Sequence, residues 1–315
     1  MLTLIVRVSL VLELIAWIAL AAWLHRSHGW SLPMGVVGAA IGSLAIRLAL
    51  VCFTCALAWI FRCERSPAQR LGPLGTLRLV LGEWRAMVAD NFWYLPFDAL
   101  AVRADPPFSR GGPTPVLLVH GYMSSRGYWA PLVRWLEERG VTNLHVPNFT
   151  SAFSTIERLA DELHEEIERI AAGTGHERVV LVCHSMGGLA ARLYMRERDE
   201  ARDALLTPLA RLITLASPHH GTALAILGLG EHGRQMRRGS AFLDALAESE
   251  AARPPAVPTL SIYSVHDNLV APQDTSRLPW ARNVAVAGLG HVALIASGRV
   301  HPQLLEEIRA AGPAG

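Results

Sequence analysis

The feature that most constrains the fold is an apolar, β-branched stretch that ends abruptly in a turn around a serine. The stretch is residues 179–183, the serine is Ser185, and Gly187 and Gly188 follow it. A helix-forming segment, residues 189–198, begins at once. A strand that turns this sharply into a helix brings the two close together, so the turn requires small residues. The pattern predicts a serine hydroxyl held above the edge of a sheet.

Strand and helix patterns alternate from residue 115 onward. Apolar strands that alternate with helices imply a mostly parallel central sheet flanked by helices, which is an α/β fold. Ligands of such sheets bind outside the carboxyl ends of the strands. The predicted strands are residues 115–119, 143–146, 178–183, 210–216, 259–264 and 283–286, and the predicted helices include 128–139, 154–172 and 235–246.

Hydrophobic residues make up 51% of the chain, and the excess over a typical soluble protein lies at the N-terminus in two apolar runs. Residues 2–24 and 33–60 are each long enough to cross a hydrocarbon core, which needs about 20 helical residues. The link between them, residues 25–32, is short and polar. We therefore expect a transmembrane hairpin over residues 1–62. A cleaved signal peptide fits less well, because only Arg7 is available to form its basic n-region and no clean cleavage site follows.

Two charges lie inside these runs, Glu13 and Arg47. They fall at similar depth in an antiparallel hairpin, so we hypothesise that they pair; the alternative is that each reaches water on its own. The second run also carries a face of small residues that allows close backbone approach, either within the hairpin or in a homodimer. This face consists of Gly35, Gly38, Ala39, Gly42 and Ser43.

Arginines follow the second run at positions 62, 65, 70, 78 and 85, whereas the link carries only Arg26. The excess of positive charge predicts that both termini face the cytoplasm, with the chain in the inner (plasma) membrane. The four cysteines do not form a disulfide framework. Cys52 and Cys55 have the spacing of a redox pair but lie within the apolar run, which argues against that role.

Residues 63–112 form a mixed connecting segment. Residues 74–89 have helical spacing. The aromatic stretch 91–97 suits either the headgroup boundary of a membrane or packing on the globular domain. Prolines and glycines at 106–107 and 111–113 mark a linker, so we place the catalytic domain at residues 113–315.

A serine hydroxyl becomes a good nucleophile only when a base takes its proton and a carboxylate orients that base. When the serine stands at a strand–turn–helix elbow, the chain order is Ser, Asp or Glu, then His. Asp267 and His291 each follow a predicted strand downstream of Ser185, and we assign them as orienting acid and base. Asp274 is an alternative acid, and the alternative bases are His266, His219 and His220, while His184 is expected to have a structural role.

The tetrahedral oxyanion of such a reaction needs hydrogen-bond donors, which backbone N–H groups normally supply. One is expected from Met186, directly after the serine. The other is expected from Tyr122, since Gly121 allows the chain to turn after the first strand of the domain.

Together these motifs resemble the bacterial serine lipases and esterases of the α/β-hydrolase fold, including membrane-associated enzymes similar to GPI-inositol deacylases. The resemblance spans about residues 115–308 and rests on five stretches: 120–122, 184–188, 217–222, 267–270 and 288–291. It implies ester hydrolysis without a cofactor, with Ser185, Asp267 and His291 as the catalytic triad. No metal site is carried over.

One position departs from the pattern, because Cys183 stands where the first glycine of G-x-S-x-G is expected. A thiol is small and apolar, so we expect Cys183 to be structural. Residues 222–257 form an insertion, and its apolar part, 223–229, is either a lid over an acyl pocket or a buried helix.

The sequence thus predicts a membrane-anchored serine hydrolase that cleaves carboxylic esters, with lipid esters favoured. A thioesterase or an acyltransferase would use the same triad, and a catalytically inactive membrane protein is a further alternative. The formal net charge of +2 gives no reason to expect a nucleic-acid partner, and the absence of lysine excludes Schiff-base chemistry.

Overall fold

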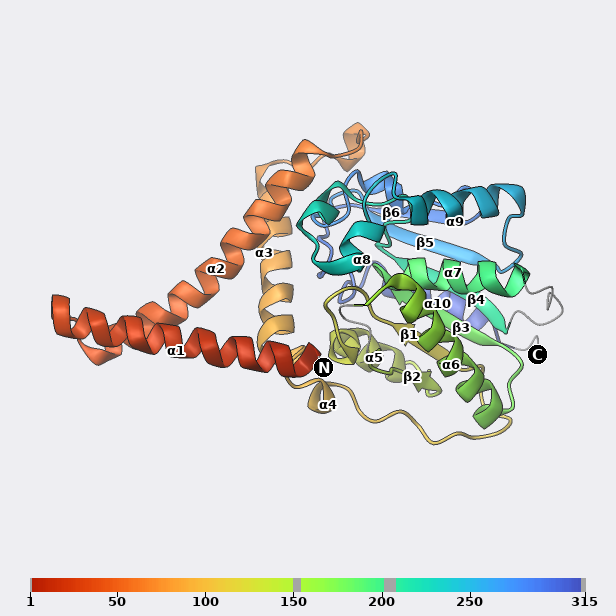
Figure 1. Ribbon diagram of the computed structural model, residues 1–315, viewed down its shortest axis with the longest axis horizontal. Helices are drawn as coiled ribbons and strands as arrows, with labels where there is room; N and C mark the ends of the chain where they lie inside the picture. Colours follow the sequence, from red (N-terminus) through yellow and green to blue (C-terminus); the bar gives the residue numbers. More distant parts are fainter. Residues whose placement is uncertain (1, 150–153, 201–207, 313–315) are drawn as a thin grey trace.

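The computed structural model describes residues 2–149, 154–200 and 208–312. Two long helices form a hairpin that projects from an α/β part, and helix α3 (Pro73–Ala89) stands between the two (Figure 1).

Within the described residues, six strands form one sheet in the order β2-β1-β3-β4-β5-β6, and every neighbouring pair is parallel. This confirms the predicted α/β fold. The strands are β1 (Val116–Val119), β2 (Leu144–His145), β3 (Val179–His184), β4 (Leu209–Leu215), β5 (Thr259–Ser264) and β6 (Arg282–Val286).

The strands read as continuous apolar runs because helices cover both faces of the sheet. In β3, Val179, Leu181 and Cys183 face one core, whereas Val180 and Val182 face the other. This alternation follows from the two-residue period of a strand. The first core is completed by α6 (Ile156–Thr174), α7 (Gly187–Glu200) and α9 (Ala241–Ala252), and the second by α5 (Ala130–Glu137) and α10 (His301–Ala310).

The ends of the helices follow local signals. Thr155 begins α6 by accepting a hydrogen bond from the Arg158 N–H on its side-chain oxygen, and Gly175 ends it with a left-handed φ of 71°. The predicted helix over 235–246 is confirmed only in its second half, residues 241–246, which lie in α9. Helix α8 (Gly230–Gln235) ends where that helix should begin, and Ser240 caps the start of α9. Gly239, with φ of 70°, makes the turn between them.

Short helical turns complete the α/β part. The 3₁₀ helix η3 (Arg126–Trp129) precedes α5, η4 (Ala223–Leu227) lies in the insertion, and η5 (Gln273–Ser276) follows β5. In η4, Leu224 and Ala225 are buried while Ile226 and Leu227 are exposed. The apolar segment is therefore only partly buried.

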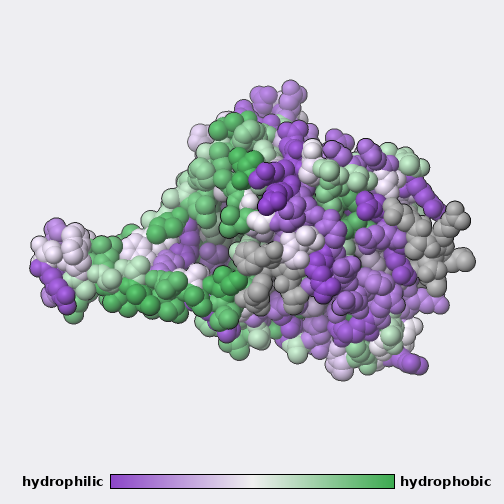
Figure 2. Space-filling view, in the orientation of Figure 1, coloured by the Kyte–Doolittle hydropathy of each residue, from purple (hydrophilic) through white to green (hydrophobic). Residues whose placement is uncertain are grey.

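The N-terminal hairpin consists of α1 (Leu2–His28) and α2 (Leu32–Ile60), joined by a turn in which Gly29 has φ of 66°. Helix α1 is longer than predicted, because His25–His28 continue it. Among the described residues, these two helices are long and apolar enough to cross a membrane. Their outer surface is dominated by hydrophobic side chains, in contrast to the polar α/β part (Figure 2).

Glu13 and Arg47 form the predicted pair across the hairpin. Arg47 Nη1 donates to Glu13 Oε1 at 2.9 Å, and Nη2 donates to Oε2 at 2.8 Å. The Ser43 hydroxyl also donates to Glu13, and the Arg47 guanidinium lies 4.1 Å from the centre of the Phe92 ring. The two charges are therefore matched by each other and by neighbouring groups.

The small-residue face packs inside the hairpin. A Cβ on Gly35 would lie 2.8 Å from the Ala21 Cβ, and one on Gly42 would lie 2.2 Å from the Trp17 ring. Close approach of α1 and α2 therefore depends on these glycines, which supports the packing role of this face within the hairpin.

The connecting segment joins the hairpin to the α/β part. It contains η1 (Pro67–Gln69), α3, a π-helical turn η2 (Asp90–Tyr94) and α4 (Asp98–Ala101). Trp84 of α3 donates to the Leu44 carbonyl of α2 at 3.0 Å. The aromatic stretch contacts both neighbours, because Phe92 packs on Arg47 and the Tyr94 carbonyl lies against Gly127.

Candidate active site

The serine predicted as nucleophile lies in a strained turn directly after β3. Ser185 has φ of 54°, a left-handed conformation that costs a non-glycine residue about 1–3 kcal/mol. Its N–H donates to the Leu215 carbonyl of β4 at 2.9 Å, which holds the turn against the sheet. A Cβ on Gly187 would lie 2.7 Å from the Val119 carbonyl, and one on Gly188 2.2 Å from Ser217 Oγ. Gly187 and Gly188 are therefore required, because a larger side chain at either position would collide with neighbouring atoms.

The loop after β1 lies against this turn. A Cβ on Gly121 would lie 2.8 Å from the Ser185 Cβ and 3.4 Å from the Met186 nitrogen. The structure thus brings together the two segments from which oxyanion donors are expected, at Tyr122 and Met186. The Tyr122 hydroxyl is hydrogen-bonded to both the N–H and the carbonyl of Leu229, at 3.0 Å each. This contact connects the insertion to the loop.

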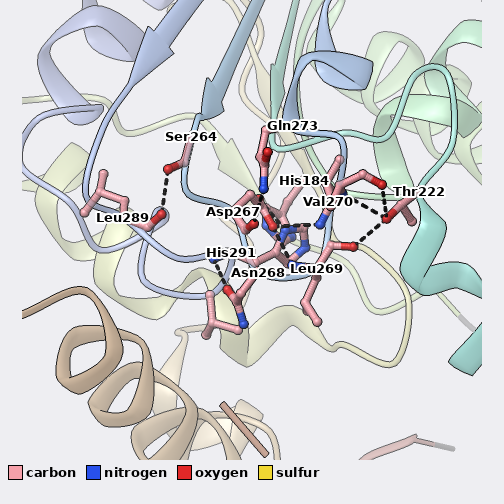
Figure 3. Close-up of polar contacts among 12 residues, drawn as sticks. His184, Thr222, Ser264, Asp267, Asn268, Leu269, Val270, Gln273, Leu289 and His291 are labelled. Carbon is pink, nitrogen blue, oxygen red and sulfur yellow. Dashed lines mark hydrogen bonds and ion pairs between the residues drawn. The ribbon is translucent and has the colours of Figure 1, made fainter. Parts of the chain in front are cut away.

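Asp267 and His291 form a direct hydrogen bond at the carboxyl ends of β5 and β6. His291 Nδ1 lies 2.8 Å from Asp267 Oδ2, and Figure 3 shows the carboxylate between the imidazole and the loop that follows it. Asp267 Oδ1 accepts from the N–H groups of Leu269 and Val270, at 2.7 and 2.8 Å. Because Nδ1 is committed to the carboxylate, Nε2 is the acceptor of the neutral ring.

The protonation of His291 depends on nearby carboxylates. The ring is 5% exposed, and burial disfavours its charged form. The negative charge and hydrogen bond of Asp267, together with the charge of Glu83, outweigh burial and raise the pKa of His291. The imidazolium that would form during catalysis is therefore stabilised where it arises.

Two residues that sequence reasoning missed hold the His291 loop. The fully buried Glu83 of α3 accepts from the N–H groups of Val292 and Ala293, at 3.0 and 2.9 Å. Asn268 accepts from the His291 N–H at 2.9 Å and donates to Thr54 Oγ1 of α2 at 2.9 Å. Glu83 had a sequence signal, since it falls one helical turn after the buried Leu79.

The alternative acid and bases lie elsewhere. Asp274 is exposed in η5. His219 is buried against Thr214, with its Nε2 3.0 Å from Oγ1, and His266 Nδ1 accepts from the Gly288 N–H at 3.1 Å. The His220 N–H donates to the carbonyl of Thr275. Within the described part of the chain, His291 is the candidate base that contacts Asp267.

The surroundings of His184 and Cys183 fit the structural roles that were expected for them. His184 Nε2 lies 3.2 Å from the Tyr128 hydroxyl, and burial lowers the pKa of this histidine far below its usual value. Cys183 is fully buried in the core, and burial raises the pKa of its thiol. Both therefore remain neutral.

Ser185 and His291 line one cavity of about 330 Å³. The insertion and the Asp267 loop supply apolar side chains to it, and other lining residues are polar. The apolar lining includes Leu224, Leu227, Met236 and Val270, and the polar lining includes Asp90, Tyr128 and His184. Among the described residues, no group of three or more His, Cys, Asp or Glu side chains is arranged to hold a metal ion.

A strained serine after the third strand of a parallel sheet, beside a His–Asp pair, defines the class of protein. Residues 116–314 match the alpha/beta hydrolase family, and the chain belongs to that family.

Relatives and solved structures agree with this assignment. The chain is 31% identical over 116 residues to a triacylglycerol lipase of Pseudomonas fragi, covering 35% of this chain and 36% of the relative. It is 28% identical over 100 residues to triacylglycerol lipase 2 of Saccharomyces cerevisiae, covering 31% of this chain and 29% of the relative. The matches thus span about a third of each relative.

Among solved structures, Aspergillus fumigatus lipase B has a TM-score of 0.55 at 18% identity, covering 66% of this chain and 55% of that one. The mature form of a Bacillus licheniformis lipase has a TM-score of 0.53 at 17% identity, covering 65% and 96%. At these identities the likeness shows the fold.

Proposed function

We propose that the protein is a serine hydrolase that cleaves carboxylic esters with Ser185, His291 and Asp267 as its catalytic triad. The observation that carries this proposal is the 2.8 Å bond between His291 Nδ1 and Asp267, formed in the wall of the cavity that Ser185 also lines. A carboxylate that orients the imidazole leaves Nε2 to take the serine proton.

In the proposed reaction, Ser185 Oγ attacks the ester carbonyl while His291 Nε2 takes its proton. The N–H groups of Met186 and Tyr122 donate to the oxyanion that develops on the carbonyl oxygen. Collapse of the tetrahedral intermediate breaks the ester bond, and His291 returns its proton to the departing alcohol. Water, activated by the same histidine, then releases the acid from the acyl-enzyme.

A lipid ester is the substrate class we favour. The cavity has an apolar side for an acyl chain, and the relatives that match the chain are named triacylglycerol lipases. In this proposal residues 1–62 anchor the protein in the inner membrane, and residues 113–315 form the catalytic domain on the cytoplasmic side. Residues 63–112 connect the anchor to the catalytic domain. Such an anchor would hold the enzyme at its substrate's surface.

The test is hydrolysis of a panel of glycerides, phospholipids and simple esters by detergent-solubilised protein, with labelling by a fluorophosphonate probe. Ser185→Ala should abolish labelling and lower kcat by about 10³-fold or more. Ser109→Ala, which alters an exposed serine before β1, should change neither. Full ester hydrolysis by Ser185→Ala would falsify the proposal. Thioester cleavage or acyl transfer to an added alcohol, if faster than ester hydrolysis, would redirect it to those activities.

A further inference from the structure

Asp90 is a buried carboxylic acid in the wall of the candidate active site that the reaction above does not use. It begins the π-helical turn η2, directly after α3, and it lines the same cavity as Ser185 and His291. Its side chain comes from the connecting segment rather than from the α/β sheet. Turns of this kind occur often at functional sites.

The carboxyl group of Asp90 is not satisfied within the protein. The residue is 8% exposed, and its Oδ1 is buried with no hydrogen-bond partner among the residues that the structure describes. The neighbouring buried aspartate, Asp98, differs in this respect. It accepts hydrogen bonds from Thr3 Oγ1, the Ala99 N–H and Asn148 Nδ2, at 3.1, 2.9 and 2.7 Å. A buried polar atom without a partner is costly, so a chain that keeps one at a cavity wall has a use for it.

Asp90 lies on the His291 side of the cavity. Asp90 interacts electrostatically with Glu83 and with Tyr128, whose pKa is raised by burial and further by the charge of Asp90. The Tyr128 hydroxyl lies 3.4 Å from the carbonyl oxygens of both His291 and Val292. The insertion, which comes from a different segment of the chain, adds apolar side chains to the lining, among them Leu224 and Leu227.

This arrangement separates the two halves of an ester. The alcohol must leave next to His291, which returns its proton, whereas the acyl chain suits the apolar lining. A group on the alcohol half is therefore the part of a substrate that lies closest to Asp90.

The protonation state of Asp90 limits which chemical groups on the alcohol half of the ester it can bind. Burial, with a smaller contribution from Glu83, raises the pKa of Asp90 to about 8, so the carboxyl is mostly neutral at pH 7. A neutral acid attracts a cationic head group poorly. It can both donate to and accept from a hydroxyl group, which has the same two capacities.

We propose that Asp90 binds a free hydroxyl group on the alcohol half of the ester, so that the enzyme selects hydroxylated esters such as partial glycerides. Because Oδ1 is buried, Oδ2 is the oxygen of this cavity-lining carboxyl group that is left to bind the hydroxyl group. This inference rests on the proposed ester hydrolysis and names its substrate class.

The test compares two esters of one acid with three-carbon alcohols, glycerol 1-octanoate and propyl octanoate, using the solubilised full-length protein. The wild type should cleave the glycerol ester with a kcat/KM at least about tenfold higher, because the propyl ester leaves the acid unpaired. Asp90→Ala should lower kcat/KM for the glycerol ester by about tenfold and leave the propyl ester within about twofold. Asp90→Asn, which retains a donor and an acceptor, should keep most of the preference.

Asp98→Asn provides the matched control, because it alters a satisfied aspartate of the same segment outside the cavity lining; any effect should be equal for the two esters. The rate of fluorophosphonate labelling reports separately on Ser185. A wild type that labels and hydrolyses but prefers neither ester would overturn the role of Asp90, as would an equal loss on both esters in Asp90→Ala. A wild type that neither labels nor hydrolyses would instead refute the proposed function.

Discussion

At the scale of single residues, the candidate site contains three buried carboxyl groups that differ in their hydrogen-bond partners. Asp267 accepts backbone N–H groups on one oxygen and His291 on the other. Glu83 accepts two backbone N–H groups of the His291 loop. Asp90 has an oxygen without a partner among the described residues. Hydrogen bonding, more than residue type, therefore distinguishes their roles.

The raised pKa of His291 predicts the acid limb of the pH–rate profile. A general base must be neutral to accept the serine proton, so activity is lost as the pH falls below the pKa of the histidine. Because this pKa lies above its ordinary value of 6.5, half-maximal kcat/KM should occur above pH 6.5. The pH dependence of hydrolysis of a soluble ester measures it. An acid limb centred at or below pH 6 would contradict the role of His291 or its pairing with Asp267.

Replacement of Asp267, the proposed orienting acid, should show whether this residue acts in the reaction itself or only in the stability of the fold. Asp267→Asn should lower kcat by about 10³- to 10⁴-fold, because an amide holds the imidazole in the wrong tautomer. Asp274→Asn, at the exposed alternative acid, should leave kcat unchanged. Initial rates and melting temperatures of both variants provide the measurement, and a large loss in the Asp274 variant alone would reverse the assignment.

Asp90 should also make stability depend on pH. Its pKa rises from about 3.8 in the unfolded chain to about 8 in the folded protein, so the folded state binds the extra proton between these values. Stability from this group is complete below the lower value and is lost as the pH rises through the upper one. The melting temperature should therefore fall as the pH rises from about 4 to about 8 and level off above that, and it should fall less steeply in Asp90→Asn. Parallel curves for the two proteins would show that the carboxyl titrates normally.

At the scale of elements, α3 supports the site from outside the sheet. Its Glu83 packs so closely that a Cβ on Gly290 would lie 2.3 Å from a carboxyl oxygen. Glu83→Ala removes two hydrogen bonds from the His291 loop. It should therefore lower kcat and slow fluorophosphonate labelling of Ser185 by about tenfold or more, and KM should change less. Glu64→Ala, at an exposed glutamate before α3, is the matched control. Equal labelling rates in the two variants would limit Glu83 to stability.

The charged pair between α1 and α2 gives a separate prediction. Glu13→Gln and Arg47→Gln should each destabilise the protein in detergent, whereas the double variant should lose less than the sum. The expected coupling energy is about 0.5–3 kcal/mol, as for residues in one hydrogen-bond network. Thermal unfolding of the four proteins completes the cycle, and strict additivity would show that the bonds contribute nothing to folding.

The elements that sequence patterns predicted are those with local causes. The elbow turn, the apolar strands and the hairpin each arise from neighbouring residues, and so does the Glu13–Arg47 pair once the hairpin is assumed. The contacts of Glu83, Thr54 and Asp90 join segments far apart in the chain, and no periodicity reveals them. The start of the helix predicted over 235–246 was wrong, because Gly239 and Ser240 begin a new helix within an otherwise helical pattern.

At the scale of the whole molecule, the hairpin and the α/β part are connected through the loops of the candidate site. Thr54 bonds to Asn268, which bonds to the His291 N–H. Close to the end of α2, the Cys63 N–H donates to Gln273 at 3.2 Å, and Gln273 donates to the Asp267 carbonyl at 2.9 Å. His291 is thus tied to the segment that we propose to anchor the protein, and Asp267 is tied to the residue directly after that segment.

These ties have a consequence for how lipid thickness would act on the enzyme. A helix longer than the surrounding hydrocarbon layer tilts to relieve hydrophobic mismatch. Tilting of α2 would displace Thr54, and through Asn268 it would shift the imidazole relative to Ser185. Turnover of a water-soluble ester in bilayer discs should therefore vary with the acyl length of the host lipid, and Thr54→Val should weaken that dependence. The bilayer would then tune the enzyme through its mechanics as well as supply its substrate.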